Sequence, residues 1–137
     1  MSDFAEIVLP AKLENLPVFL ETTLGWAREQ GLPHKKIDDL ELALEEALVN
    51  VFHYAYPDKE GEIKVAFQKD RHNLIIQIID SGLAFNPLAK EDPNLSLDVG
   101  ERSIGGLGVF LIKTIIDKVE YQRKNNQNIL TLVVYVQ

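Results

Sequence analysis

The sequence predicts an α+β fold, a two-layer sandwich in which a mixed, mostly antiparallel sheet carries its helices on one face. Three observations support this: β-rich runs are joined in pairs by short polar turns, two helical segments follow one another near the N-terminus, and the order of elements is β-α-α-β-β-loop-α-β-β. Hairpin strands pair antiparallel, and helices grouped apart from them cover one face. With 137 residues, 46% of them apolar, we expect one domain spanning 1–137 around a single core.

The first third of the chain predicts a strand followed by two helices. The apolar run 7–9 ends at Pro10, as an edge or opening strand does. A first helix is expected from Asn15, a plausible cap, to Gly31, a common C-terminal stop. A longer, largely buried helix is expected from about Pro33 to Tyr56, because one stripe collects Leu40, Leu44, Ala47 and Val51.

The remaining elements predict two hairpins separated by a long loop. Residues 63–67 alternate apolar and polar side chains, as in a strand with one wet face, and the turn 70–73 joins them to an apolar strand at 74–79. Residues 85–103 lack periodicity and are a candidate mobile loop or lid. A helix at 109–117 is followed by strands at 119–123 and 129–136, joined through Asn125-Asn126.

Composition narrows the class of protein. The chain has no cysteine and only three histidines, which makes a zinc site improbable. Its net charge of -7 opposes direct binding to nucleic acid or to an anionic membrane, although backbone amides and a cation can still hold one nucleotide. The acidic N-terminus lacks a targeting pattern and no apolar run is long enough to span a bilayer, so we expect a cytoplasmic protein.

Three polar side chains lie close together on the predicted long helix. Glu46 and Asn50 are four residues apart on one face, and His53 continues the same line. An amide oxygen there can ligate Mg²⁺ on nucleotide phosphates, while a carboxylate can take a proton from an attacking hydroxyl. The alternative is a solvated acidic helix with a structural histidine, but Asn50 stands in an apolar segment where its amide needs partners.

Two further motifs are candidates for nucleotide binding. Asp80-Ser81-Gly82 ends an apolar strand, so that the carboxylate could accept a hydrogen bond from an amine such as that of adenine, and the missing Cβ of Gly82 could let a flat base approach. Gly105-Gly106-Leu107-Gly108 precedes an apolar helix and could present N–H groups to an anion. Each motif also has a purely structural interpretation, a turn for the first and a flexible hinge for the second.

The order of these motifs resembles that of GHKL (histidine-kinase-like) ATP-binding domains over nearly the whole chain. The blocks EEALVN (45–50) with HYAY (53–56), DSGLAFNP (80–87) and GGLGVFLI (105–112) are together similar to anti-sigma-factor serine/threonine kinases of the RsbW and SpoIIAB type. The resemblance implies bound ATP and Mg²⁺, with Glu46 as general base, Asn50 as metal ligand and Asp80 as adenine reader. The cofactor-binding set that it implies is Asn50, His53, Asp80, Gly82, Phe85, Gly105, Gly106, Leu107 and Gly108.

The function implied by the resemblance is ATP-dependent phosphorylation, on serine or threonine, of a STAS-type antagonist protein, coupled to binding of a sigma factor and carried out by a homodimer. The alternative is a nucleotide-gated partner-binding module with little or no phosphoryl transfer. Glu46 argues against it, because a hydroxyl acceptor needs a base. A detached histidine-kinase domain is disfavoured, since no helix carries an obvious phosphoacceptor histidine with its own dimerising partner. Simple ATP hydrolysis is a fourth possibility.

Two features depart from the family pattern. Asn86 stands where relatives commonly carry Asp before the proline, which removes a charge at the entrance of the lid. The loop 90–103 cannot be matched residue by residue, so Arg102 is only a candidate phosphate ligand.

Overall fold

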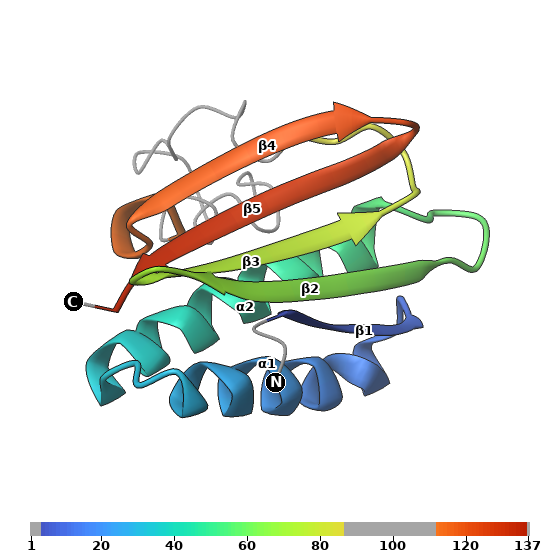
Figure 1. Cartoon of the computed structure of the whole chain (residues 1–137). Coiled ribbons are helices and arrows are strands. Elements are labelled where there is room, and N and C mark those ends of the chain that lie inside the picture. Colours follow the sequence, from blue (N-terminus) through green and yellow to red (C-terminus); the bar gives the residue numbers. More distant parts are fainter. Residues whose placement is uncertain (1–3, 87–111, 137) are drawn as a thin grey trace, which may run out of the picture.

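The computed structural model describes residues 4–86 and 112–136, and its elements follow the predicted order (Figure 1). Residues 112–115, just before the last hairpin, are helical and belong to the helix predicted at 109–117. The described elements, in chain order, are β1 (Phe4–Pro10), the short 3-10 turn η1 (Leu13–Asn15), α1 (Leu16–Glu29), α2 (His34–Tyr54), β2 (Glu62–Asp70), β3 (Asn73–Asp80), β4 (Lys118–Lys124) and β5 (Gln127–Tyr135).

The five strands form one open sheet in the order β1-β2-β3-β5-β4. The sequence predicted a mixed, mostly antiparallel sheet. All four strand pairings of the described part are antiparallel. Both predicted hairpins are confirmed. Arg71 lies at the tip of the first with a φ of 59°, and Asn125 and Asn126 form the tip of the second with φ values of 54° and 63°. Asparagine tolerates this left-handed backbone better than most residues, and two such residues in a row suit a tight hairpin.

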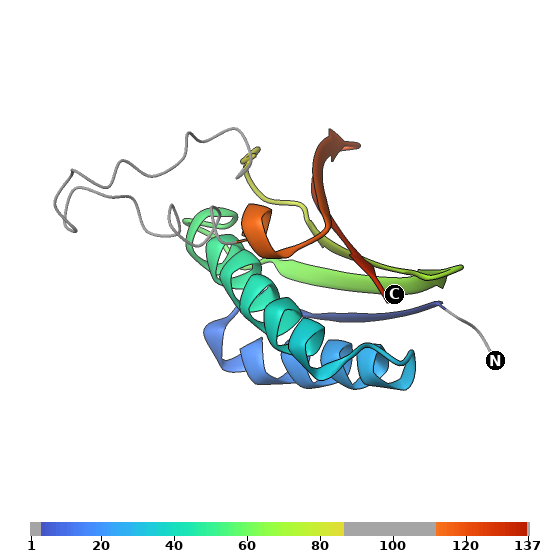
Figure 2. The same cartoon turned by 90° about the vertical axis from the view of Figure 1, so that its left-hand side faces the viewer.

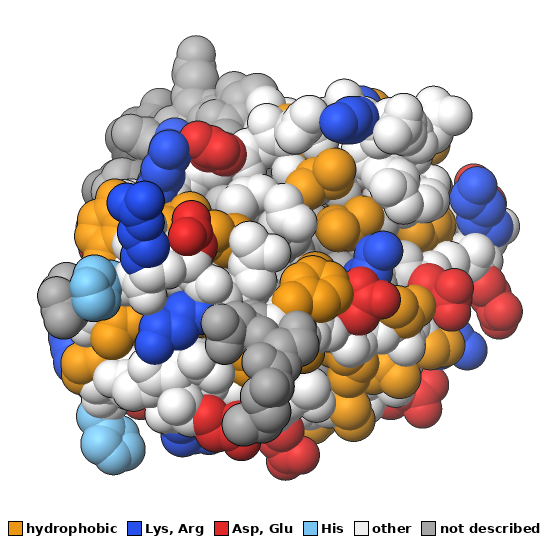
Figure 3. Space-filling view, viewed as in Figure 1, with side chains coloured by type: hydrophobic (Ala, Val, Ile, Leu, Met, Phe, Trp, Pro, Cys, Tyr) orange, Lys and Arg blue, Asp and Glu red, His pale blue; other side chains and the backbone are white. Residues whose placement is uncertain are grey.

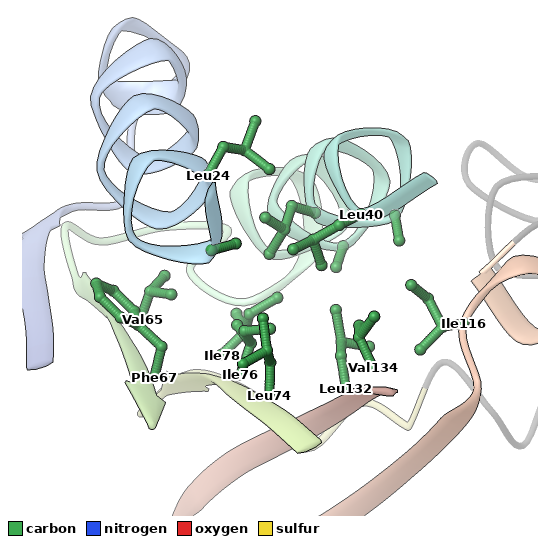
Figure 4. Packing of buried hydrophobic residues seen from close by; sticks show 14 of the residues in the cluster. Leu24, Leu40, Val65, Phe67, Leu74, Ile76, Ile78, Ile116, Leu132 and Val134 are labelled. Atoms are coloured by element: carbon green, nitrogen blue, oxygen red, sulfur yellow. The ribbon is translucent and has the colours of Figure 1, made fainter. Parts of the chain in front are cut away.

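Both helices lie on the same face of the sheet, as the sequence predicts (Figure 2). The core fills the space between these two layers (Figure 4). The stripe predicted for the long helix is confirmed, with Leu40, Leu44 and Ala47 buried and Val51 half-buried. Alternate residues of the central strands point toward it, among them Val65 and Ile76, and each fully buried aliphatic side chain of this kind contributes about 1.5–3 kcal/mol relative to exposure.

The opposite face of the sheet is open to solvent, as predicted for the strand at 63–67. Hydrophobic, acidic and basic side chains are interspersed on the side of the molecule seen in Figure 3. Phe4, Val8 and Tyr135 are exposed. Between β1 and β2, Nζ of Lys64 lies 4.0 Å from Oε2 of Glu6. Apolar and polar side chains therefore alternate along these strands because only one face of the sheet is buried.

The first helix begins differently from the expectation. Asn15 occupies the position before α1, but its side chain makes no capping bond to the helix; its Nδ2 donates instead to the carbonyl of Pro10 at 2.8 Å. The 3-10 turn before α1 brings the chain back toward β1, so the Asn15 side chain joins strand and helix. Gly31, with a φ of 88°, ends the helix as predicted.

No helix in the described part of the chain is long and apolar enough to cross a membrane.

Candidate functional site

A pocket lies between the C-terminal half of α2 and the inner face of β3, β5 and β4. The volume that the centre of a water-sized sphere can occupy in it is about 30 Å³, and part of the pocket is open to solvent. Its walls are mainly apolar, with four polar side chains among them, as in pockets for small organic ligands. The described residues that line it are Ala47, Asn50, Val51, Ala55, Ile78, Asp80, Phe85, Ile112, Tyr121, Asn128 and Leu130.

Asn50 reaches this pocket from α2. It is 4% exposed and lines the pocket together with Asp80 and Asn128. A buried amide needs hydrogen-bond partners, and a ligand in the pocket can supply them. This position explains why a mediocre helix former stands in an apolar helical segment, since Asn50 lines a cavity where its polar group can meet a ligand.

Glu46 lies one helical turn before Asn50, half-buried and outside the described wall of the pocket. The two side chains share one face of α2, as predicted. His53 is exposed and does not line the pocket either; its ring is 6.1 Å from that of Tyr54. Of the three polar residues predicted on this helix, only Asn50 therefore contacts the cavity directly.

Asp80 closes β3 on the opposite wall and is 4% exposed. Its Oδ1 accepts two hydrogen bonds, from the backbone N–H of Gly82 at 2.9 Å and from Nδ2 of Asn128 at 2.9 Å. The first is the local bond by which an aspartate shapes a turn. Because both bonds use Oδ1, the second oxygen, Oδ2, is available to a ligand. Asp80 and Asn50, 30 positions apart in the sequence, meet in one pocket.

Gly82 has a structural reason to be glycine. A Cβ built on it would lie 2.2 Å from the carbonyl oxygen of Ala55, at the end of α2. The next residue, Leu83, donates its N–H to that same oxygen at 2.9 Å. The loop after β3 is thus pressed against the helix end, where only a residue without Cβ fits. The role suggested by the sequence, approach of a base, stays a prediction.

Phe85 lines the pocket and stacks on Tyr54 of α2, with ring centres 5.2 Å apart and planes inclined by 21°. Its N–H donates to Oδ1 of Asn128 at 3.3 Å. Offset stacking of this kind holds the loop after β3 over the end of the helix. The predicted phosphate-binding residues Gly105, Gly106, Leu107 and Gly108, like the loop 90–103 with Arg102, lie outside the described residues.

Sequence reasoning missed several residues of this site. Asn128 and Tyr121, on β5 and β4, line the pocket, and Arg123 Nη1 donates to the carbonyl of Gly82 at 2.9 Å. Asn128 carried a usable signal: it opens an apolar strand on the inner side of the alternation, the same anomaly that singled out Asn50. Tyr121 and Arg123 carried none, because ordinary alternation explains both.

Tyr56 ties the end of α2 to two strands. Its hydroxyl donates to the carbonyl of Glu62 at 2.7 Å and accepts from the N–H of Ser81 at 2.8 Å. Burial raises the pKa of this hydroxyl above its ordinary value of 10.0, and the nearby charge of Asp80 adds to the rise. Tyr56 therefore stays neutral and keeps the residue after Asp80 in place.

An antiparallel sheet covered by helices on one face, with an apolar pocket that combines one buried carboxylate and two buried amides, is an arrangement that suits a small organic ligand such as a nucleotide. Residues 9–134 match the family model of the histidine kinase-like ATPase domain, and the chain belongs to this family. Curated relatives include the serine-protein kinases RsbW of Bacillus cereus (strain AH820) and of Bacillus anthracis. Each is 30% identical to the chain over 136 residues, which is 96% of the chain and 84% of the relative. ATP-dependent kinase activity is thus the function that this kinship assigns.

Solved structures agree on the fold. A crystal structure of the RsbU and RsbW domains of a Mycobacterium tuberculosis protein superposes with a TM-score of 0.69 at 18% identity, covering 97% of this chain and 32% of that one. The catalytic domain of the histidine kinase ThkA superposes with a TM-score of 0.57 at 14% identity, covering 97% of both chains. These likenesses confirm the predicted histidine-kinase-like α+β fold.

Proposed function

We propose that the chain is a serine/threonine protein kinase that uses Mg·ATP to phosphorylate a STAS-type antagonist protein and that also binds a sigma factor. The observation that carries the proposal is that the buried Asn50 and the buried Asp80 line one pocket whose other walls are mainly apolar. The kinship with serine-protein kinases RsbW supports the acceptor class and the partners. In this proposal the protein is cytoplasmic, consists of a single domain and works as a homodimer.

Asp80 is the proposed adenine reader, and the apolar walls hold the base. Its free Oδ2 can accept a hydrogen bond from the 6-amino group, while Val51, Ile78 and Leu130 offer flat apolar contact to the ring. The loop 80–85 is held by the helix end and by Asn128, so this carboxylate is oriented before a nucleotide arrives. Such preorganisation reduces the entropy that binding must offset.

Asn50 is the proposed ligand of Mg²⁺. Its amide oxygen, in a buried position on the pocket wall, suits a hard cation that takes oxygen ligands and completes its shell with nucleotide phosphates and water. The cation, when bound, would neutralise charge on the phosphates. The glycine block 105–108 is the proposed phosphate-facing hinge.

Glu46 is the proposed general base. In the transfer, the oxygen of a serine or threonine hydroxyl attacks the γ-phosphorus, the bond from that phosphorus to the β–γ bridging oxygen breaks, and ADP leaves. The hydroxyl proton passes to the Glu46 carboxylate. The position of Glu46, on the Asn50 face of α2 and outside the described wall of the pocket, fits a group that meets the protein substrate rather than the adenine.

The sharpest test uses two neighbouring glutamates of one helix. Glu46→Gln should bind Mg·ATP with an affinity within about threefold of the parent chain, yet transfer phosphate to the antagonist at least about 100-fold more slowly, because general-base catalysis contributes on that order. Glu45→Gln is the matched control: Glu45 is exposed and adjacent, and its variant should retain both properties. Calorimetric titration measures binding, and phosphoserine or phosphothreonine on the antagonist measures transfer.

Other outcomes separate the alternatives. If the parent chain binds ATP but leaves no phosphate on any STAS-type antagonist that it binds, it is a nucleotide-gated binding module. Steady release of inorganic phosphate without a protein substrate would instead identify an ATPase. Absence of any binding heat with millimolar Mg·ATP would overturn the proposal as a whole.

A further inference from the structure

We propose that Asn128 determines the preference of the pocket for adenine over guanine by saturating Oδ1 of Asp80, which leaves a single carboxylate oxygen for the base. The inference rests on the proposed function, in which Asp80 reads the nucleotide base. It adds a specificity role for a residue of β5 that does not itself need to touch ATP.

The first step is the geometry of the pair. Asp80 and Asn128 are directly opposite each other in the β3–β5 register, and they are 4% and 5% exposed. Nδ2 of Asn128 lies 2.9 Å from Oδ1 of Asp80, and the N–H of Gly82 lies 2.9 Å from the same oxygen. A carboxylate oxygen offers two lone-pair directions. Both directions of Oδ1 are therefore taken by the protein.

The second step is the orientation of the Asn128 amide. Its Nδ2 also donates to the carbonyl of Leu83 at 2.7 Å, and its Oδ1 accepts from the hydroxyl of Tyr121 and from the N–H of Phe85. Turning the amide by half a rotation would place an acceptor against the carboxylate of Asp80 and the carbonyl of Leu83. The four contacts thus allow one orientation only, with the donor toward Asp80.

The third step is the chemistry of the two purines. Adenine presents one exocyclic amine, a donor that a single carboxylate oxygen can accept. Guanine presents its N1–H and 2-amino group side by side, which pair best with a carboxylate that has both oxygens free, and its 6-carbonyl is repelled by an anion. An aspartate alone could serve either base. With Oδ1 saturated by Asn128 and Gly82, only the adenine contact remains.

The test compares Mg·ATP and Mg·GTP by titration calorimetry on the full chain. For Asn128→Leu, which keeps the approximate shape and removes the amide, the ratio of the GTP to the ATP dissociation constant should fall at least about tenfold, the size expected when one discriminating polar contact is lost. Asn128→Thr, whose hydroxyl can still donate to Asp80, should retain most of the parent ratio. Thr131→Val is the matched control, because Thr131 lies on the same strand, accepts from Gln77 at 3.3 Å and does not line the pocket, and its ratio should stay within about threefold of the parent.

Three results would overturn the inference. In the first, Asn128→Leu weakens ATP and GTP by the same factor, which is the behaviour of a merely structural residue. In the second, the ratio is unchanged. In the third, Asn128→Thr loses the preference as fully as the leucine variant. If the leucine variant does not fold, as judged by circular dichroism, Asn128→Ala replaces it under the same criteria. A parent chain that binds no ATP would refute the proposed function itself, whereas a parent chain that prefers ATP and variants that keep the ratio would refute this inference alone.

Discussion

The two ends of helix α2 are attached to the sheet by different kinds of interaction. At its N-terminal end, Nζ of Lys36 lies 3.7 Å from Oδ2 of Asp117 and donates to the carbonyl of Tyr135. The side chains of Lys36 and Asp117 are each about a third exposed. At its C-terminal end the carbonyl of Ala55 accepts the N–H of Leu83, and Gly82 packs against it. The first attachment is a solvated charge pair, and the second is close backbone packing.

The difference shows where the fold can position a ligand. A solvated ion pair tolerates movement and is weakened by salt, whereas backbone packing at van der Waals contact leaves no room for adjustment. The pocket lies at the second end, where Asp80 leaves the sheet and Tyr54 stacks on Phe85. Precise placement of a carboxylate needs the rigid attachment, while the charged end serves mainly to align the helix. Three predictions test this contrast.

The largest effect is expected from Gly82→Ala. The new Cβ would lie 2.2 Å from the backbone oxygen of Ala55, which cannot move without displacing the helix end, so we expect a loss of about 3 kcal/mol in the free energy of unfolding. Urea denaturation measures it. Gly25→Ala is the matched control, since a Cβ there meets no atom within 4 Å and a helical alanine should add about 0.5–1 kcal/mol. Equal stabilities of the two variants would remove the distinction between the two ends of α2.

A smaller effect is expected from Tyr56→Phe, which removes the hydroxyl that joins Glu62 and Ser81. The loss should be about 1 kcal/mol at neutral pH, since water can reach the exposed Ser81 and replace part of the bond. The same variant should change the alkaline limb of the stability curve. Because the pKa of Tyr56 is raised above 10.0, the folded chain keeps the proton when the unfolded chain has lost it. That stability is fully present below the unfolded value and is lost as pH rises through the folded value.

Unfolding measured from pH 9 upward should therefore decline less steeply for Tyr56→Phe than for the parent chain. Tyr135→Phe, at an exposed position on the open face of the sheet, serves as the control. Identical slopes for Tyr56→Phe and the parent would show that the Tyr56 hydroxyl does not couple the helix end to the strands.

The smallest effect is expected at the other end of α2. Lys36→Met keeps the apolar stem and removes the charge that faces Asp117, and it should cost about 0.5 kcal/mol, because a pair that is about a third exposed is screened by solvent. The difference from the parent should shrink further in 1 M salt. A loss above about 2 kcal/mol would mean that this end is as tightly held as the pocket end.

Most of the fold followed from local patterns along the chain. The period-two runs, the apolar stripe of α2 and the paired asparagines at 125 and 126 each act within a few residues, so hydrophobic periodicity and backbone preference were enough to predict strands, helices and hairpins. Asn50 and Asp80 stood out for a related reason, because a polar group inside an apolar run needs a partner or a cavity. The sequence also carried the ordered motifs by which the family was recognised.

Only the tertiary structure decided how these residues work together. Asn128 and Asp80 are 48 positions apart and become partners only when β5 pairs with β3. Glycine is needed at position 82 because the carbonyl of Ala55, at the end of α2, packs directly against it. Long-range contacts of this kind depend on strand order and register, which result from the packing of the whole sheet. A polar residue inside an apolar strand shows that a partner is needed, but the residues nearby do not identify that partner.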